Sequence, residues 1–147
     1  MASLLVYASM TGNTQDMADA VAAGVQEAGG EIEQKDVIDA SASELEQADG
    51  ILLGAYTWGD GDLPDEFLDF YEEMDNVDLT GKIAAVFGSC DSAYPAYGAA
   101  VDLLIEKLRE RGAVVLQEGL KIELSPSNEE TEICKEFGRT FFKNLSE

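Results

Sequence analysis

The sequence contains no histidine among its 147 residues. Without an imidazole there is no Ser-His-Asp or Cys-His catalytic group and no histidine-ligated metal site. Basic residues are also few, because nine Lys and Arg stand against 30 Asp and Glu and leave a formal net charge of −21 at pH 7. Such a surface repels nucleic acid and anionic membranes and favours a basic protein partner, unless the acidity serves only to keep the chain in solution.

Cysteine is equally scarce, with Cys90 and Cys134 the only two. Two thiols do not make a disulfide framework, so we expect a reducing, cytoplasmic location. The N-terminus lacks the basic and apolar segments of a signal peptide, and no apolar run approaches the roughly 20 residues of a membrane helix. The length and an apolar content of 46% predict one domain, residues 1–147, with its own core.

What the sequence does contain is an alternation of two hydrophobic periods. Continuous apolar runs at 4–8, 51–55 and 83–87 are typical of buried strands, whereas the more polar 31–37 predicts an edge strand. A last strand is expected at 114–116, resuming over 120–124. Between the strands, apolar residues recur at the three-and-four spacing of amphipathic helices. Two pairs with the spacing of a capping box, Ser43 with Glu46 and Ser127 with Glu130, predict helix starts.

This order is a β-α unit repeated about five times. It predicts an α/β, doubly wound five-stranded parallel sheet with helices on both faces and the strand order 2-1-3-4-5. In such sheets ligands bind beyond the carboxyl ends of the strands, at the point where the winding reverses. The loops that start at Ser9, Tyr56 and Gly88 are therefore expected at one edge, as a single site.

The first of these loops has the chemistry of a phosphate cup. Ser9-Met10-Thr11-Gly12-Asn13-Thr14 carries three hydroxyls, an amide and a glycine between a strand and a helix. The N–H groups and positive dipole end of the helix attract an anion, hydroxyls donate further bonds, and Gly12 lets the backbone approach closely. An ordinary hydroxyl-capped turn is the alternative interpretation of this loop.

The other two loops each add an aromatic residue, Trp58 and Tyr94, among glycines and acids. Each could be an ordinary half-buried loop residue. Together, beside a phosphate cup, they could stack on both faces of a planar heterocycle, and flavin mononucleotide (FMN) fits. Competing sites lack their motifs: there is no GxxxxGK[ST], no GxGxxG after the first strand, and no calcium-loop spacing around Asp60, Asp62 and Asp65. Cys90 is expected to fill space rather than act as a redox thiol, and Cys134 to lie in the core.

Three motifs in register resemble the flavodoxin family. They are Ser9-x-Thr11-Gly12-x-Thr14, Thr57-Trp58-Gly59-Asp60-Gly61 and Gly88-x-x-Asp91-Ser92-x-Tyr94. The resemblance covers essentially the whole chain, and the absence of a roughly 20-residue insertion in the fifth strand makes it similar to the short-chain class. Flavodoxin is itself the standard example of this strand order with FMN at the switch point.

The resemblance implies a role for each loop. The first would wrap the FMN phosphate, Trp58 and Tyr94 would flank the isoalloxazine, and the Gly59 peptide would turn over on one-electron reduction to face N5–H. Asp91 and the backbone beside it would contact the pyrimidine edge. The complete set of expected FMN-binding residues is Ser9, Met10, Thr11, Gly12, Asn13, Thr14, Tyr56, Thr57, Trp58, Gly59, Asp60, Gly61, Ser89, Cys90, Asp91 and Tyr94, with no catalytic residue and no metal ligand.

The function implied is that of a low-potential one-electron carrier, not an enzyme. The fully reduced flavin is anionic, so nearby carboxylates repel it and lower the second reduction potential. The expected partners are a reductase and client oxidoreductases with basic docking patches, and the carrier is expected to be a monomer that binds neither nucleic acid nor membrane. An FMN-dependent quinone reductase is the alternative. A phospho-acceptor receiver domain is disfavoured because Ser9-Met10 and Tyr56-Thr57 stand where its acids would be.

Overall fold

A computed structural model describes residues 2–9, 12–57, 62–90, 98–123 and 126–146. Strands and helices alternate along these residues, with three short 3₁₀ helices between them. In chain order the elements are β1 (Ala2–Tyr7), α1 (Asn13–Glu27), β2 (Glu31–Asp36), η1 (Val37–Asp39), η2 (Ala42–Gln47), β3 (Gly50–Gly54), α2 (Asp65–Glu73), η3 (Met74–Asn76), β4 (Ile83–Cys90), α3 (Ala99–Glu110), β5 (Val114–Val115), β6 (Leu120–Glu123) and α4 (Asn128–Ser146).

The sheet has the predicted topology. Its strands are parallel in the order β2-β1-β3-β4-β5, and β6 pairs with β4 beyond β5. The fifth strand is thus divided into two pieces, with Ile83 and Ala84 facing β5 and Phe87 to Cys90 facing β6. The interruption leaves Leu116 outside the strand, where the side chain is 61% exposed, so the predicted extension of β5 to this residue is wrong. A leucine that faces solvent has no apolar neighbour to hold it in register.

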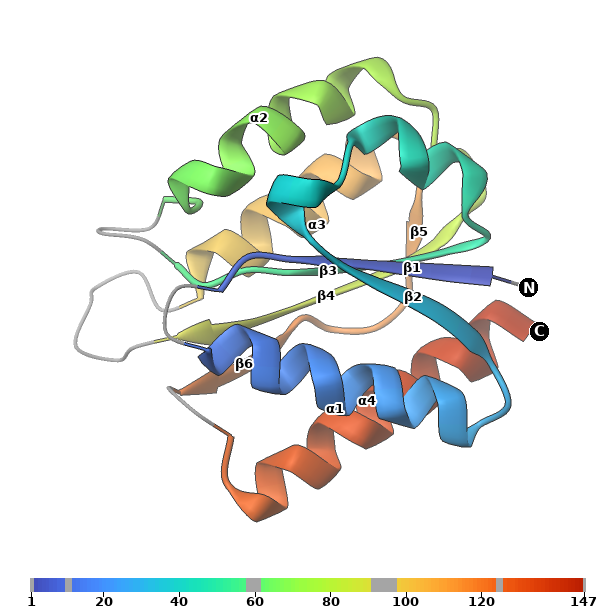
Figure 1. Cartoon of the computed structure of the whole chain (residues 1–147). Helices are drawn as coiled ribbons and strands as arrows, with labels where there is room; N and C mark the ends of the chain where they lie inside the picture. The colour runs from blue at the N-terminus through green and yellow to red at the C-terminus, as the bar shows by residue number, and fades with distance from the viewer. Residues whose placement is uncertain (1, 10–11, 58–61, 91–97, 124–125, 147) are drawn as a thin grey trace.

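Helices cover both faces of the sheet, α2 and α3 on one and α1 and α4 on the other (Figure 1). Alternate residues of β1 serve the two layers: Leu4 and Val6 pack with Phe67 on the α2–α3 side, whereas Leu5 belongs to the α1–α4 cluster. The apolar helical faces expected from the sequence are buried except at Tyr71 and Ile105, which are half-buried, and Cys134 is fully buried on α4. Among the described residues no helix is long and apolar enough to cross a membrane.

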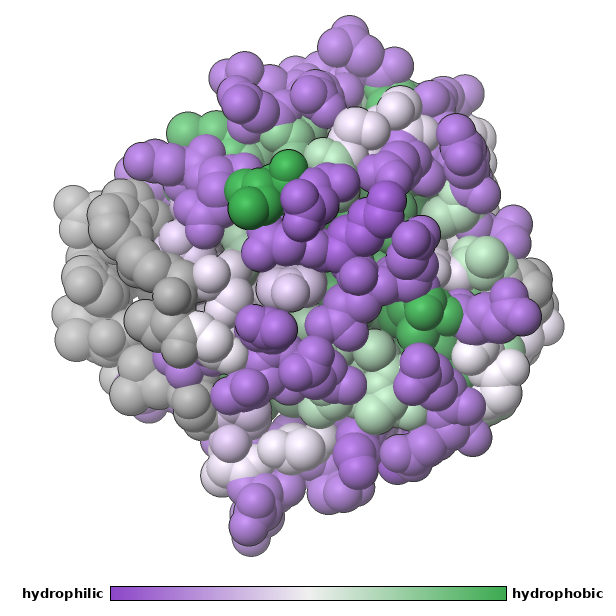
Figure 2. Space-filling model, in the orientation of Figure 1, coloured by the Kyte–Doolittle hydropathy of each residue, from purple (hydrophilic) through white to green (hydrophobic). Residues whose placement is uncertain are grey.

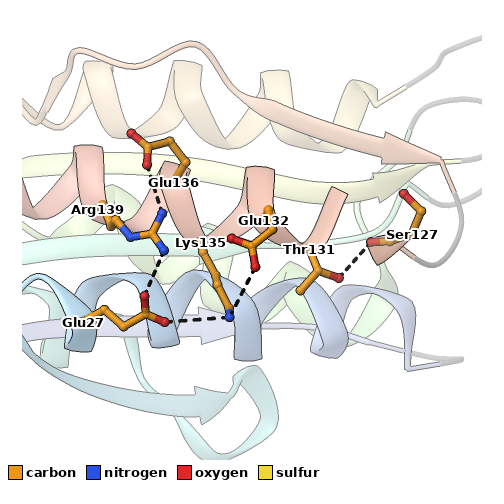
Figure 3. A network of polar contacts seen from close by, with 7 residues as sticks. All are labelled: Glu27, Ser127, Thr131, Glu132, Lys135, Glu136 and Arg139. Atoms are coloured by element: carbon orange, nitrogen blue, oxygen red, sulfur yellow. Dashed lines mark hydrogen bonds and ion pairs between the residues drawn. The ribbon is translucent and has the colours of Figure 1, made fainter. Parts of the chain in front are cut away.

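Helices α1 and α4 touch through their backbones. A Cβ added at Gly24 would lie 2.0 Å from the carbonyl oxygen of Lys135, and one added at Gly138 would lie 2.1 Å from that of Val21. A charged network spans the same pair of helices outside this contact (Figure 3). In it Arg139 donates to Glu27 at 2.9 Å, and Lys135 lies 3.8 Å from the same carboxylate. The two helices together cover this face of the sheet (Figure 1).

The capping boxes are confirmed at one helix and corrected at another. Ser127 and Glu130 exchange the expected bonds at the start of α4, at 3.0 and 3.1 Å. At η2 the box uses Ser41 and Glu44, not Ser43 and Glu46, and the Ser41 N–H donates to Glu44 at 2.8 Å. The sequence offers both registers, and the structure takes the one in which the acid also pairs with Lys35.

The edge strand predicted over 31–37 is β2, which ends at Asp36, one residue before the predicted end.

Candidate functional site

Strands β1 and β3 end level with each other, and β4 runs beside them for three residues more, to Cys90. Tyr7 of β1 is in register with Gly54 of β3, and Gly54 with Phe87 of β4. The ladder continues one step further, because the Ala8 N–H donates to the Gly54 carbonyl at 2.9 Å and the Ala55 N–H to the Phe87 carbonyl at 3.2 Å. The strands point to the end of the molecule opposite the two termini (Figure 1). The chain therefore leaves β1 and β3 at the expected edge of the sheet. The predicted start of the third loop at Gly88 is wrong, because β4 continues to Cys90 by pairing with β6, and the residues that follow, 91–97, lie outside the described residues.

The first loop leads directly into α1. Gly12 precedes the helix with φ +91°, a left-handed conformation that favours glycine, and it has no side chain to cap the helix. The Ser9 hydroxyl takes this role instead, accepting the N–H of Gly12 at 3.1 Å and of Gln15 at 3.3 Å. Because Ser9 Oγ accepts both of these bonds, its own O–H is left as a donor at the positive end of the helix, which is chemistry that suits a phosphate.

A buried hydrogen bond joins the first loop to the third. The hydroxyls of Thr14, on the first turn of α1, and Ser89, near the end of β4, are 2.7 Å apart. Thr14 is 1% exposed and Ser89 5% exposed, so neither hydroxyl can satisfy itself with bulk water. The sequence singled out both residues, but it gave no sign that they bond to each other.

The second loop begins with side chains that tie it to α2 and α3. The Tyr56 hydroxyl donates to Glu66 on α2 at 2.9 Å, and Thr57 Oγ1 accepts the N–H of Ala100 in the first turn of α3 at 3.2 Å. Burial, with the Glu66 carboxylate beside it, raises the pKa of Tyr56 well above its usual range. Tyr56 therefore stays a neutral donor at any ordinary pH. Sequence reasoning missed both bonds because they cross between elements.

Glycines let the strand ends come close together. A Cβ at Gly54 would lie 2.4 Å from the ring of Phe87, and one at Gly88 would lie 2.2 Å from the carbonyl oxygen of Ala55. Such distances are impossible for a side chain, so both positions require glycine on steric grounds. The close approach holds β3 and β4 at fixed spacing where the second and third loops begin.

Cys90 closes β4 as a buried thiol. It is 5% exposed, and its Sγ lies 3.6 Å from the Gly88 carbonyl. Burial raises the pKa of the Cys90 thiol to about 11, which leaves almost no reactive thiolate near neutral pH. The expectation that Cys90 fills space agrees with this burial. Cys134 is similar, because burial raises its thiol pKa to about 11 as well.

Half of the expected FMN-binding residues lie within the described parts of the chain. Ser9, Gly12 and Asn13 stand at the start of α1, Thr14 and Ser89 are bonded to each other, and Tyr56, Thr57 and Cys90 follow β3 or end β4. The others lie outside the described residues, and these are Met10, Thr11, Trp58, Gly59, Asp60, Gly61, Asp91 and Tyr94.

Comparison with known proteins gives the family. The family model described as Flavodoxin matches residues 5–138. The chain belongs to the flavodoxin family. It is 48% identical to Probable flavodoxin 2 of Bacillus subtilis over 95% of this chain and 93% of that one. A solved structure of oxidised Flavodoxin 1 from Bacillus cereus is 62% identical, with a TM-score of 0.95 over 97% of this chain and 98% of that one.

Membership of the family fixes the cofactor and the class of function. This flavodoxin is of the short-chain class, binds FMN and carries electrons to redox partners, and it is not an enzyme. A flavodoxin of Maridesulfovibrio salexigens is 41% identical over 87% of this chain and 90% of that one. The quinone-reductase alternative is not favoured by these relatives.

The described residues fit FMN on their own chemistry. The start of α1 offers the Ser9 hydroxyl and the positive end of the helix dipole, and no Lys or Arg occurs between residues 9 and 14. The buried Thr14–Ser89 bond places a second hydroxyl at the junction between the phosphate loop and β4. In a chain of net charge −21, a phosphate is best held by such directed dipoles in a confined place, since the surface as a whole repels anions.

Proposed function

We propose that the FMN of this flavodoxin is held by the loops that follow β1, β3 and β4, and that the carrier works at low potential. The observation that supports this proposal is that three neighbouring parallel strands run to the same edge of the sheet, where the bonded hydroxyls of Thr14 and Ser89 join the start of α1 to the end of β4. The proposed binding residues are the sixteen listed above. FMN supplies one-electron transfer when bound, and the protein supplies its position and its surroundings.

The phosphate end of the site is built from the start of α1. Ser9 holds the N–H groups of Gly12 and Gln15 in a common direction, and the helix dipole adds a positive potential there. Residues 9–14 thereby set affinity and position. The residues after β3 and β4 set the environment of the ring, and those after β3 are held in place because Tyr56 and Thr57 tie them to α2 and α3.

Binding of FMN and of riboflavin by the apoprotein separates these two parts. Ser9→Ala removes an oxygen that organises the phosphate end, so we expect FMN to bind about fivefold to tenfold more weakly, the equivalent of one hydrogen bond of about 1 kcal/mol. Riboflavin, which has no phosphate, should bind the variant as well as it binds the parent. Ser43→Ala, which removes an exposed hydroxyl on η2, is the matched control. Equal losses for both flavins would refute the assignment of Ser9 to the phosphate.

A surface hollow beside the proposed ring site supports an acidic docking face. This hollow of about 420 Å³ is lined by Asp62, Leu63, Asp65, Leu68, Tyr71 and Leu103. Leu68 is 41% exposed, which gives the hollow an apolar centre between two carboxylates. The partner surface that complements it has a basic rim around an apolar contact. Figure 2 shows a mainly hydrophilic face on which strongly hydrophobic residues form only separate small spots.

Electron transfer to a basic cytochrome tests the docking face. Leu68→Lys places a like charge against the partner and should slow the second-order rate about tenfold, with FMN affinity unchanged. Leu116→Lys makes the same change at an exposed leucine beside β5 and should slow the rate much less. Equal slowing by the two variants would mean that total charge, and not this hollow, directs docking.

Two finer statements belong to the same proposal. We infer one FMN domain over residues 1–147 that acts as a monomer, since its high like charge opposes self-association. A cytoplasmic location is supported by two cysteines that are both free and buried. Sedimentation of the holoprotein at low and high salt tests the monomer, and a dimer under both conditions would contradict it.

A further inference from the structure

One ion pair stands out because it connects β6 with the start of α3. Lys121 Nζ lies 3.0 Å from Asp102 Oδ2, in the first turn of that helix. Lys121 is in register with Gly88 of β4, one residue before Ser89 of the proposed site. The other six ion pairs of the described residues lie on α4, α1, β2, η2, η3 and the last turn of α3.

The methylene chain of Lys121 is held by packing, as its ammonium is held by the ion pair. Gly98 stands before α3 with φ +69°, and an added Cβ there would lie 2.4 Å from Cδ of Lys121. The methylene chain therefore runs across Gly98 to reach Asp102. This packing fixes the ammonium at the edge where β4 ends and α3 begins. The side chain of Lys121 is only 28% exposed, so solvent screens its charge incompletely.

The field of the pair reaches the proposed cofactor site. Against the larger effect of burial, which raises the pKa of Cys90, the Lys121 ammonium lowers that pKa, and the carboxylates of Asp102 and of Glu123, which is in register with Cys90, raise it. Cys90 is one of the proposed FMN-binding residues. The two opposite charges of the pair therefore act on the same atoms, and they cancel only while both are present.

We propose that Lys121 and Asp102 balance each other beside the site, so that each cancels the shift that the other alone would cause in the potential at which the bound flavin accepts its second electron. The inference rests on the proposed site. Lys121 favours the anionic reduced cofactor and Asp102 disfavours it, so the pair itself adds no net charge to an edge that also carries Glu123. Neither residue touches the cofactor in this account, and both act through the electrostatic field.

Four proteins make the test: the parent, Lys121→Met, Asp102→Asn and the double variant. Methionine keeps the stem over Gly98 and removes only the charge. One unit charge at roughly 10 Å in an effective dielectric of about 40 changes an equilibrium about fourfold. The affinity for the fully reduced relative to the oxidised flavin should fall about fourfold in Lys121→Met and rise about fourfold in Asp102→Asn. Each change corresponds to roughly 35 mV at 59 mV per tenfold.

The double variant and a distant lysine give the decisive controls. Lys121→Met with Asp102→Asn restores the net charge of the parent, so its second potential should return close to that of the parent. Lys143→Met changes total charge equally but lies in the last turn of α4, at the end of the molecule near the termini (Figure 1). Its shift should be much smaller. Raising the salt from 0.05 to about 0.5 M should shrink every shift, because the Debye length falls to a few ångströms.

The outcomes separate the pair from the site. Shifts of opposite sign that cancel in the double variant support the inference. Shifts of one sign, or no larger than that of Lys143→Met, overturn it and leave the proposed site standing. A parent apoprotein that does not bind FMN overturns the proposed site and the role of the pair together.

Discussion

At the scale of single residues, the site depends on polar groups that satisfy one another before any cofactor arrives. The Thr14 and Ser89 hydroxyls are both buried and bond at 2.7 Å. Thr14→Val keeps the shape of the side chain but leaves the Ser89 oxygen buried without this partner. The free energy of unfolding of the apoprotein should fall by about 1–3 kcal/mol.

Chemical denaturation of a double-mutant cycle measures this bond. Ser89→Ala should cost a similar amount, and the double variant should lose less than the sum of the two single losses, because the second substitution removes a group that already lacks its partner. Additive losses would show that the two hydroxyls act independently. Thr131→Val, which removes an exposed hydroxyl that donates to Ser127, should cost much less.

The sequence predicted the residue types of the site better than their connections. Ser9, Gly12 and Thr14 were recognisable because a phosphate needs hydroxyls, N–H groups and a glycine at a helix start. The bond from Thr57 to Ala100 was not predictable, because the two residues are 43 positions apart and meet only when α3 packs beside β3. Similarly, nothing local to Lys121 indicates that its partner is Asp102.

At the scale of elements, helix propensity and helix packing make opposite demands on Gly138, where α4 contacts α1. Gly138→Ala should favour an isolated helix by about 1 kcal/mol. The added methyl, however, would lie 2.1 Å from the Val21 carbonyl oxygen. The two helices cannot move apart to make room for it without disturbing their packing on the sheet. We expect packing to win, with a net loss of stability of about 1–3 kcal/mol. Thermal unfolding measures the sign, and a rise in Tm would show that the helices separate readily.

A second element-scale prediction concerns the ion pair between α3 and η3. Lys107 is only 7% exposed, pairs with Asp75 and lies 4.5 Å from the ring centre of Tyr71, whereas the Asp75 side chain is 58% exposed. Removing Asp75 leaves a buried ammonium without its anion, but removing Lys107 leaves only an exposed carboxylate. Asp75→Asn should therefore destabilise more than Lys107→Met.

The pH dependence of this pair has a definite sign. Its hydrogen bond to Asp75 raises the pKa of Lys107 above the usual value of 10.5. The stabilisation is then fully present below that usual value and is lost as the pH rises through the higher folded pKa. Urea unfolding of both variants at pH 7 and above pH 10.5 measures which variant loses more stability, and whether that difference shrinks at high pH. A larger loss of stability in Lys107→Met than in Asp75→Asn at pH 7 would refute the claim that the lysine is the buried partner.

Element types and order were predictable from the sequence, but some boundaries were not. The apolar runs gave β1, β3 and β4 because strands buried on both faces have no polar positions. The register of the η2 cap was missed, because the choice between Ser41 and Ser43 depends on Lys35 from another element. The division between β5 and β6 was anticipated as a resumption of the strand, yet Leu116 was assigned to it because its solvent exposure cannot be read from its type.

At the scale of the whole molecule, the dominant feature is like charge. With a net charge of −21, the folded apoprotein concentrates repulsion that the unfolded chain disperses. Raising the salt from about 0.01 to 0.5 M shortens the Debye length from roughly 30 Å, comparable with the molecule, to a few ångströms. The Tm of the apoprotein should therefore rise by several degrees. A Tm that falls or stays constant would mean that the seven ion pairs of the described residues outweigh the repulsion.

The central claim is that three strand ends and their loops form one FMN site that lowers the potential of the flavin. The most direct measurement is a reductive titration of the reconstituted holoprotein at defined potentials. The account predicts stoichiometric FMN binding and two separate one-electron steps, the second at a more negative potential than that of free FMN. A single two-electron step, or a second potential no lower than that of free FMN, would contradict it.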